Sequence, residues 1–264
     1  MHARDVVGVV FDEYIPDEGV HLSRLSTLFA ALEIEPATVR ATVARMRREG
    51  LLFSRRIGRE TIYRASDEYR SALDEDRARS YRLASDKWAG TWTIVLYQIP
   101  EAERGRREKL KRILLDDGFG QLNATTWVSP HDDRERMHRM LGCHDDPTIV
   151  VLNASTGGLT EDLELVDKCW ELDEIAGGYR AFLERWGGLA ADCEPSAPDA
   201  AFRARVEIIS DWRHFPSHDP RLPRALQPAG WPAQQALEIY HRAESCLRRG
   251  AQAFVDATFG APSP

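Results

Sequence analysis

The chain has 264 residues, of which 29% are charged, and its formal net charge is −7. This length accommodates about one to three domains, and the composition is ordinary for a globular protein. There is no apolar run of about eighteen residues, and residues 1–5 do not resemble a signal peptide. The cysteines lie far apart without a C-x-x-C pair. We therefore expect a cytoplasmic protein without a membrane span, a zinc site or a disulfide framework.

Three helices and a hairpin are predicted within residues 1–65. Apolar residues recur at helical spacing over residues 4–14, 22–32 and 36–50. Pro36 suits the first position of the third helix, and Gly50 suits a left-handed stop after it. Gly58 supplies the positive φ for a hairpin between residues 52–56 and 60–64. This order predicts a winged helix-turn-helix, in which the third helix enters the major groove of DNA.

Positive charge is concentrated on the third helix and the hairpin. Residues 36–64 hold eight arginines against two glutamates, whereas residues 1–35 alone carry −5. A basic island in an acidic chain indicates where a polyanion docks. We expect Arg64 to lie on or near the hairpin tip. The candidate DNA-binding residues are Thr38, Arg40, Ala41, Arg45, Arg48, Arg55, Arg56 and Arg59. The alternative is a solvated amphipathic helix followed by an ordinary hairpin.

The middle of the chain changes character twice. Residues 66–87 are highly charged and contain no Gly or Pro, which predicts an exposed helical connector. Residues 88–158 then alternate between strand-like and helix-like segments. These are a strand over 93–99, a helix over 104–117, a strand over 121–129, a helix over 134–141 and a strand over 148–154. The alternation predicts a small ferredoxin-like α+β domain.

Residues 159–264 are predicted to form a C-terminal helical domain. We expect one long or broken helix over 161–186, with Leu163 and Trp170 among its apolar residues at mixed helical spacing, and a loop over 187–200. Two more helices follow over 202–215 and 232–259, joined by a proline-rich extended connection. The predicted fold class is therefore α+β, with an N-terminal winged helix-turn-helix, a central ferredoxin-like domain and C-terminal helices.

Short motifs in three successive parts of the chain carry a family resemblance. They are residues 37–51 with 54–59, then 88–92, 98–101, 118–120 and 127–130, then 211–213, 219–223 and 230–232. In this order they resemble the PaaX-like regulators, a repressor family that controls phenylacetic acid catabolism in bacteria. The central part is similar in fold to the CRISPR-associated spacer-acquisition nuclease. Two motifs depart from the family pattern: Gln227 stands where Leu is expected, and Ala233 where Gly is expected.

The resemblance implies a dimeric transcriptional repressor of a catabolic operon. Such a repressor binds double-stranded operator DNA and releases it when an acyl-CoA-type effector, such as phenylacetyl-CoA, binds. Trp212, Arg213 and Trp231 are the candidate effector-binding residues, although tryptophans more often anchor a core. The alternative from another class is an RNA- or protein-binding module built around the ferredoxin-like domain, without operator-specific DNA recognition. Competition between duplex DNA and RNA discriminates the two.

No catalytic centre, cofactor or metal site is predicted. A metal-dependent nuclease needs a carboxylate at the end of the first central strand, where this chain has the neutral Gln98. Residues 143–146 (Cys-His-Asp-Asp) lack a second spaced pair of ligands, so a polar loop explains them better. The helix over 104–117 is strongly basic. Its basic side is either a solvated face or a second patch for DNA or the phosphates of coenzyme A.

Overall fold

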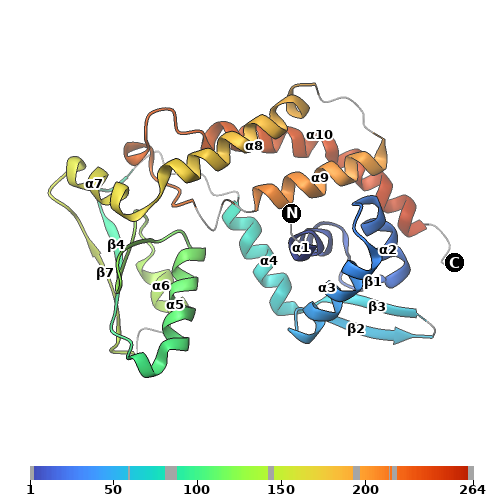
Figure 1. Cartoon of the computed structure of the whole chain (residues 1–264), viewed down its shortest axis with the longest axis horizontal. Coiled ribbons are helices and arrows are strands. Elements are labelled where there is room, and N and C mark those ends of the chain that lie inside the picture. The colour runs from blue at the N-terminus through green and yellow to red at the C-terminus, as the bar shows by residue number, and fades with distance from the viewer. Residues whose placement is uncertain are drawn as a thin grey trace. The chain divides into compact units, whose positions relative to one another are not determined.

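The computed structural model describes residues 3–58, 60–80, 88–141, 146–192, 197–213, 215 and 219–260, and these combine helices with two antiparallel sheets (Figure 1). The chain divides into two compact units. The first comprises residues 1–81, 181–213 and 235–264, and the second comprises residues 82–180 and 214–234. Among the described helices, none has the length and apolar character needed to cross a membrane.

The N-terminal part of the first unit has three helices and a small sheet. The helices are α1 (Ala3–Tyr14), α2 (Leu22–Ala31) and α3 (Pro36–Arg48), and the strands are β1 (Val20–His21), β2 (Leu52–Ile57) and β3 (Glu60–Ala65), in the order β1-β3-β2. The short strand β1 was not predicted. It pairs with β3 beside Gly19, whose φ is 92° and whose Cβ, if present, would lie 2.5 Å from the carbonyl oxygen of Tyr63. Gly50 and Gly58 take the predicted left-handed conformation, with φ of 77° and 61°.

Four further helices contribute to the first unit. They are α4 (Asp67–Ser80), the part of α8 (Leu172–Asp192) from residue 181 onward, α9 (Pro198–Trp212) and α10 (Ala233–Gly260). The Phe202 ring of α9 lies 5.1 Å from the rings of both Tyr14 and Phe254, so α9 packs between α1 and α10. The predicted loop over 187–200 is wrong at both ends. Helix α8 continues through Gly187 and Gly188, and α9 begins at Pro198.

Buried ion pairs join α1 to helices that lie far away in sequence. Arg205 of α9 donates hydrogen bonds to Glu244 of α10 at 2.9 and 2.7 Å, to Glu13 at 2.7 Å and to the Tyr14 hydroxyl at 2.7 Å. The side chains of Arg205 and Glu244 are only 8% and 5% exposed. Burial opposes a charge on Glu244, but hydrogen bonds from Arg248 and Arg205 outweigh burial and lower its pKa.

The second unit is built on a four-stranded antiparallel sheet. Its strands are β4 (Trp92–Tyr97), β5 (Gly120–Asn123), β6 (Thr126–Ser129) and β7 (Ile149–Ala154), in the order β5-β6-β4-β7. Helices α5 (Arg104–Asp116) and α6 (Arg134–Leu141) cover one face (Figure 1), where Leu114 and Met137 pack on Trp127. The strand predicted over 121–129 is instead a hairpin of two strands, because the chain reverses between Asn123 and Thr126.

The other face of this sheet is covered at one end. Helix α7 (Leu159–Cys169) and the short 3-10 helix η3 (Arg224–Leu226) pack there on Trp92 and Val128. The Trp92 indole donates to Asp162 at 2.8 Å and so joins β4 to α7. A second 3-10 helix, η1 (Glu101–Glu103), precedes α5. The predicted helix over 161–186 is broken between α7 and α8. Leu163, one of the apolar residues of the predicted helix, is 39% exposed.

The described residues contain no group of three His, Cys, Asp or Glu placed to hold a metal ion. Of the motif at residues 143–146, only Asp146 lies within the described ranges. Cys246 is disulfide-bonded, which the wide spacing of the cysteines did not predict. Cys169 is a free thiol, and burial raises its pKa to about 11.

Candidate nucleic-acid interface

Helix α3 presents one apolar and one basic face. Val39, Val43 and Met46 are at most 3% exposed and point toward the core of the first unit. Because these residues recur every three or four positions, the remaining positions share the opposite side of the helix. That side is exposed, and it carries the sequence-selected residues Thr38, Arg40, Ala41, Arg45 and Arg48.

The arginines on this face are not neutralised by close partners. The Arg45 Nε lies 3.9 Å from Glu49, and Glu49 also pairs with Arg4 at 3.2 Å. Arg40 and Arg48 form no ion pair with any residue in the described ranges. The exposed pairs of Glu49 with Arg45 and Arg4 contribute little free energy to folding. The guanidinium groups on this face can therefore bind phosphate oxygens or base edges at little cost.

The hairpin of β2 and β3 carries the second group of candidates. Arg55 faces Ile62 and Arg56 faces Thr61, next to the turn, and both arginines are exposed. The Arg56 Nε donates to the carbonyl oxygen of Gly58 at 3.2 Å, which holds that side chain over the turn. Arg59 lies outside the described residues.

Arg64 does not lie near the hairpin tip, so that prediction is wrong. The strand register pairs it with Phe53, at the end of the hairpin away from the turn. There its guanidinium carbon lies 5.2 Å from the centre of the Phe53 ring, and it also pairs with Asp67 at 3.5 Å. The six-residue strands set this position, because each residue moves the pairing about 3.3 Å further from the turn.

Some surface residues were not selected from the sequence. Phe53 and Ile57 are 48% and 45% exposed, and they share a strand face with Arg55 because side chains alternate along β2. Arg47 donates to Ser54 Oγ at 3.2 Å and joins α3 to the hairpin. The sequence signal for this mixed face was the placement of Phe53, Arg55 and Ile57 at every second position of β2.

The effector candidates occupy two different units. Trp212 is 5% exposed and stacks on Tyr240, with ring centroids 4.8 Å apart. Arg213 pairs with Asp12 and lies 3.3 Å from Glu13, all within the first unit. Trp231 belongs to the second unit, where its ring packs edge-on against Tyr179 at 6.3 Å. Their role in effector binding stays a prediction.

Comparison with known proteins gives one family over three consecutive segments. Residues 2–69 match the family described as PaaX-like protein, residues 85–166 match the PaaX protein central Cas2-like domain, and residues 170–257 match the PaaX-like protein C-terminal domain. The transcriptional repressor PaaX of Escherichia coli K12 is 26% identical over 246 residues, which cover 89% of this chain and 77% of the relative.

A solved structure shares the fold over almost its whole length. The uncharacterized protein Rv0674 from Mycobacterium tuberculosis is 21% identical and superposes with a TM-score of 0.60, covering 97% of this chain and 98% of the other. The three matches follow one another along the chain, and the Cas2-like match covers the segment that contains the four-stranded sheet. This chain belongs to the PaaX-like family.

Proposed function

We propose that this protein is a DNA-binding transcriptional repressor whose N-terminal helices and hairpin act as a winged helix-turn-helix. The observation that carries the proposal is the exposed basic face of α3, in a segment with eight arginines against two glutamates. Similarity to the Escherichia coli repressor supports the same function. In this arrangement α3 enters the major groove, and Arg55, Arg56 and Arg59 of the hairpin contact the flanking backbone.

The roles within α3 follow from side-chain size and charge. Ala41 and Thr38 are small enough to let the helix backbone approach the base edges closely. Arg40, Arg45 and Arg48 reach outward from successive turns, so they can contact guanine edges or phosphates. A homodimer would read two half-sites whose spacing is fixed by the geometry of the protein.

The test begins with selection of bound duplexes from a random DNA library, which yields the preferred operator. Fluorescence anisotropy then compares wild-type protein with Arg45→Ala. We expect the substitution to weaken operator binding by roughly 1–3 kcal/mol and to relax the preference at one base pair. Arg249→Ala is the matched control, because Arg249 is an exposed arginine of α10 without a close ion pair in the described residues.

Two outcomes would contradict the proposal. One is a selection that returns no sequence preference. The other is an equal effect of Arg45→Ala and Arg249→Ala, which would mean that only net charge matters. Preferential binding of RNA over the duplex in competition would favour the alternative module built around the central domain.

We further propose that an acyl-CoA-type effector, such as phenylacetyl-CoA, releases the operator. Membership of the PaaX-like family supports this regulation, with Trp212, Arg213 and Trp231 as candidate contacts. An effector shifts a two-state equilibrium only by the difference between its affinities for the two states. The test is operator binding across a panel of acyl-CoAs and free acids. Release by free acids alone would reject the acyl-CoA class.

A further inference from the structure

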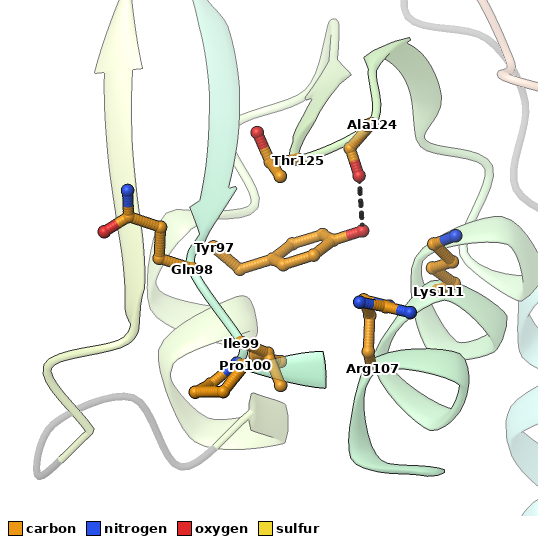
Figure 2. Close-up of a pocket in the computed structure, with 8 residues that line it drawn as sticks. All are labelled: Tyr97, Gln98, Ile99, Pro100, Arg107, Lys111, Ala124 and Thr125. Carbon is orange, nitrogen blue, oxygen red and sulfur yellow. Dashed lines mark hydrogen bonds between the residues drawn. The ribbon is translucent and has the colours of Figure 1, made fainter. Parts of the chain in front are cut away.

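The second unit contains a pocket at the end of β4 that the proposed operator contacts do not use. Its volume is about 530 Å³ (Figure 2). Three segments form it: residues 97–100 at the end of the strand, Arg107 and Lys111 of α5, and the turn residues Ala124 and Thr125 between β5 and β6. The pocket therefore lies where a strand end, a helix and a hairpin turn of one unit meet.

On the inner wall of the pocket, the polar groups of Tyr97 and the backbone N–H of Gln98 are paired within the protein. Tyr97 is 3% exposed, and its hydroxyl donates to the carbonyl oxygen of Ala124 at 2.7 Å (Figure 2). The backbone N–H of Tyr97 donates to Thr125 at 3.0 Å, and that of Gln98 donates to Thr148 at 2.8 Å. The charged hydrogen-bond donors at the pocket are the side chains of Arg107 and Lys111 of α5.

These two cations differ from the other basic residues of the same helix. Arg107 and Lys111 lie one turn apart and line the pocket, with side chains 23% and 30% exposed. The other basic residues of α5, which do not line it, are Arg104, Arg106, Lys109 and Arg112. The basic character of α5 noted in the sequence therefore has two parts, a solvated part and a part that faces the pocket.

Neighbouring carboxylates hold the cations loosely in place. Arg107 pairs with Glu101 at 2.8 Å, but the Glu101 side chain is 74% exposed and can yield to a stronger anion. Lys111 lies 3.8 Å from Glu108, beyond hydrogen-bond distance. A guanidinium has five N–H donors and an ammonium has three, so most of the donors at the pocket remain for a ligand.

We propose that this pocket binds the phosphate group of a nucleotide-type ligand, with Arg107 and Lys111 as the anion-binding residues. Two adjacent cations match the charge of a phosphate better than that of a single carboxylate, and Arg is suited to bind phosphate oxygens in pairs. The volume exceeds that of a phosphate ion and falls within the range of small-molecule sites, so it leaves room for the group to which the phosphate is attached. The neutral Gln98 at the strand end adds no negative charge that would repel the ligand.

The same phosphate chemistry has two sources, a free nucleotide and a nucleic-acid strand. Isothermal titration calorimetry of the full chain with ADP and, separately, with a mixed-sequence single-stranded dodecamer distinguishes them. We expect at least one probe to bind, and EDTA to leave its affinity unchanged. Arg107→Ala/Lys111→Ala should weaken that binding at least tenfold. Lys109→Ala/Arg112→Ala, which removes the same charge from the same helix, should change it less than twofold.

A second pair of variants covers the case in which a double variant fails to fold. Lys111→Glu and Lys109→Glu each reverse one charge on the surface of α5, and circular dichroism checks that both remain folded. Lys111→Glu should weaken binding by more than tenfold, and Lys109→Glu by less than threefold. Equal losses of affinity in the two members of either pair would overturn the proposal, because they would mean that the ligand is attracted nonspecifically by the positive charge of α5. Absence of binding by both probes to wild-type protein at millimolar concentration would also overturn it.

Discussion

Replacing Arg205 with methionine should destabilise the first unit more than any exposed substitution. The Arg205 side chain is 8% exposed and donates to two carboxylates and one hydroxyl. Methionine keeps the apolar stem, so the loss of free energy comes almost entirely from the missing charge and hydrogen bonds. After the substitution, Glu13 and Glu244 remain largely buried, at 15% and 5% side-chain exposure, without their shared cation.

The expected magnitude follows from this geometry. Breaking a buried ion pair by removing one partner costs roughly 3–5 kcal/mol, because a charge stays buried without compensation. Glu244 keeps hydrogen bonds from Arg248 at 2.7 and 3.2 Å, and Glu13 keeps its contact with Arg213 at 3.3 Å; both offset part of the loss. We therefore expect Arg205→Met to lower the free energy of unfolding by about 3 kcal/mol, the lower end of this range.

Urea unfolding followed by circular dichroism measures the effect, with the exposed Arg249→Met as control. The control should stay within about 0.5 kcal/mol of wild type. Adding Glu244→Gln to Arg205→Met should restore part of the lost stability, because it removes one of the buried charges. A cost below about 1 kcal/mol for Arg205→Met would refute the reasoning, since that is the value for an exposed pair.

Three further predictions use other features of the structure. The pKa of Glu244 is lowered in the folded state, so its contribution to stability is present above its unfolded pKa of about 4.3 and is lost as the pH falls through its folded pKa. Glu244→Gln should therefore make the free energy of unfolding depend less on pH in the acidic range. Gly19→Ala should lower the free energy of unfolding by about 2 kcal/mol or more, measured by thermal unfolding, because its Cβ would collide with the Tyr63 backbone. Gly58→Ala, with open space around its Cβ, should lower it by about 1 kcal/mol. Arg55→Ala should lower the slope of log K against log salt for DNA by about 0.9, the value for one phosphate contact; an unchanged slope would exclude that contact.

Local patterns were enough to predict most elements of the N-terminal part. The apolar spacing of Val39, Val43 and Met46 gave the orientation of α3, and Gly58 gave the hairpin turn. These features depend on a few neighbouring residues, so they can be read without knowing the rest of the fold.

Elements that depend on distant contacts could not be predicted in this way. Trp170, within the segment predicted as one long or broken helix, takes an extended backbone between α7 and α8. Its indole donates to the carbonyl oxygen of Gly118 at 3.2 Å and stacks on Trp92, so a tertiary contact overrides helix propensity. The pairing of Arg213 with Asp12 joins residues about two hundred positions apart, and composition offers many equivalent partners for each arginine.

The same is true of the pocket beside β4. The sequence showed that α5 is basic, but the fold decides which cations face the strand end. Arg107 and Lys111 lie apart from the turn residues Ala124 and Thr125 in the sequence, and the fold brings them together at one pocket. Which cations of α5 face the pocket and which face solvent therefore depends on the three-dimensional fold.

The anchoring of α1 by distant helices has a consequence for engineering. Asp12 and Glu13 pair with Arg77 of α4, Arg205 of α9 and Arg213, which directly follows α9. A chimera that exchanges the first 65 residues between relatives would break these pairs unless the recipient supplies the same three arginines. New DNA specificity is therefore better introduced by substituting only the outward side chains of α3, because this leaves the ion pairs between α1 and the distant arginines unaltered.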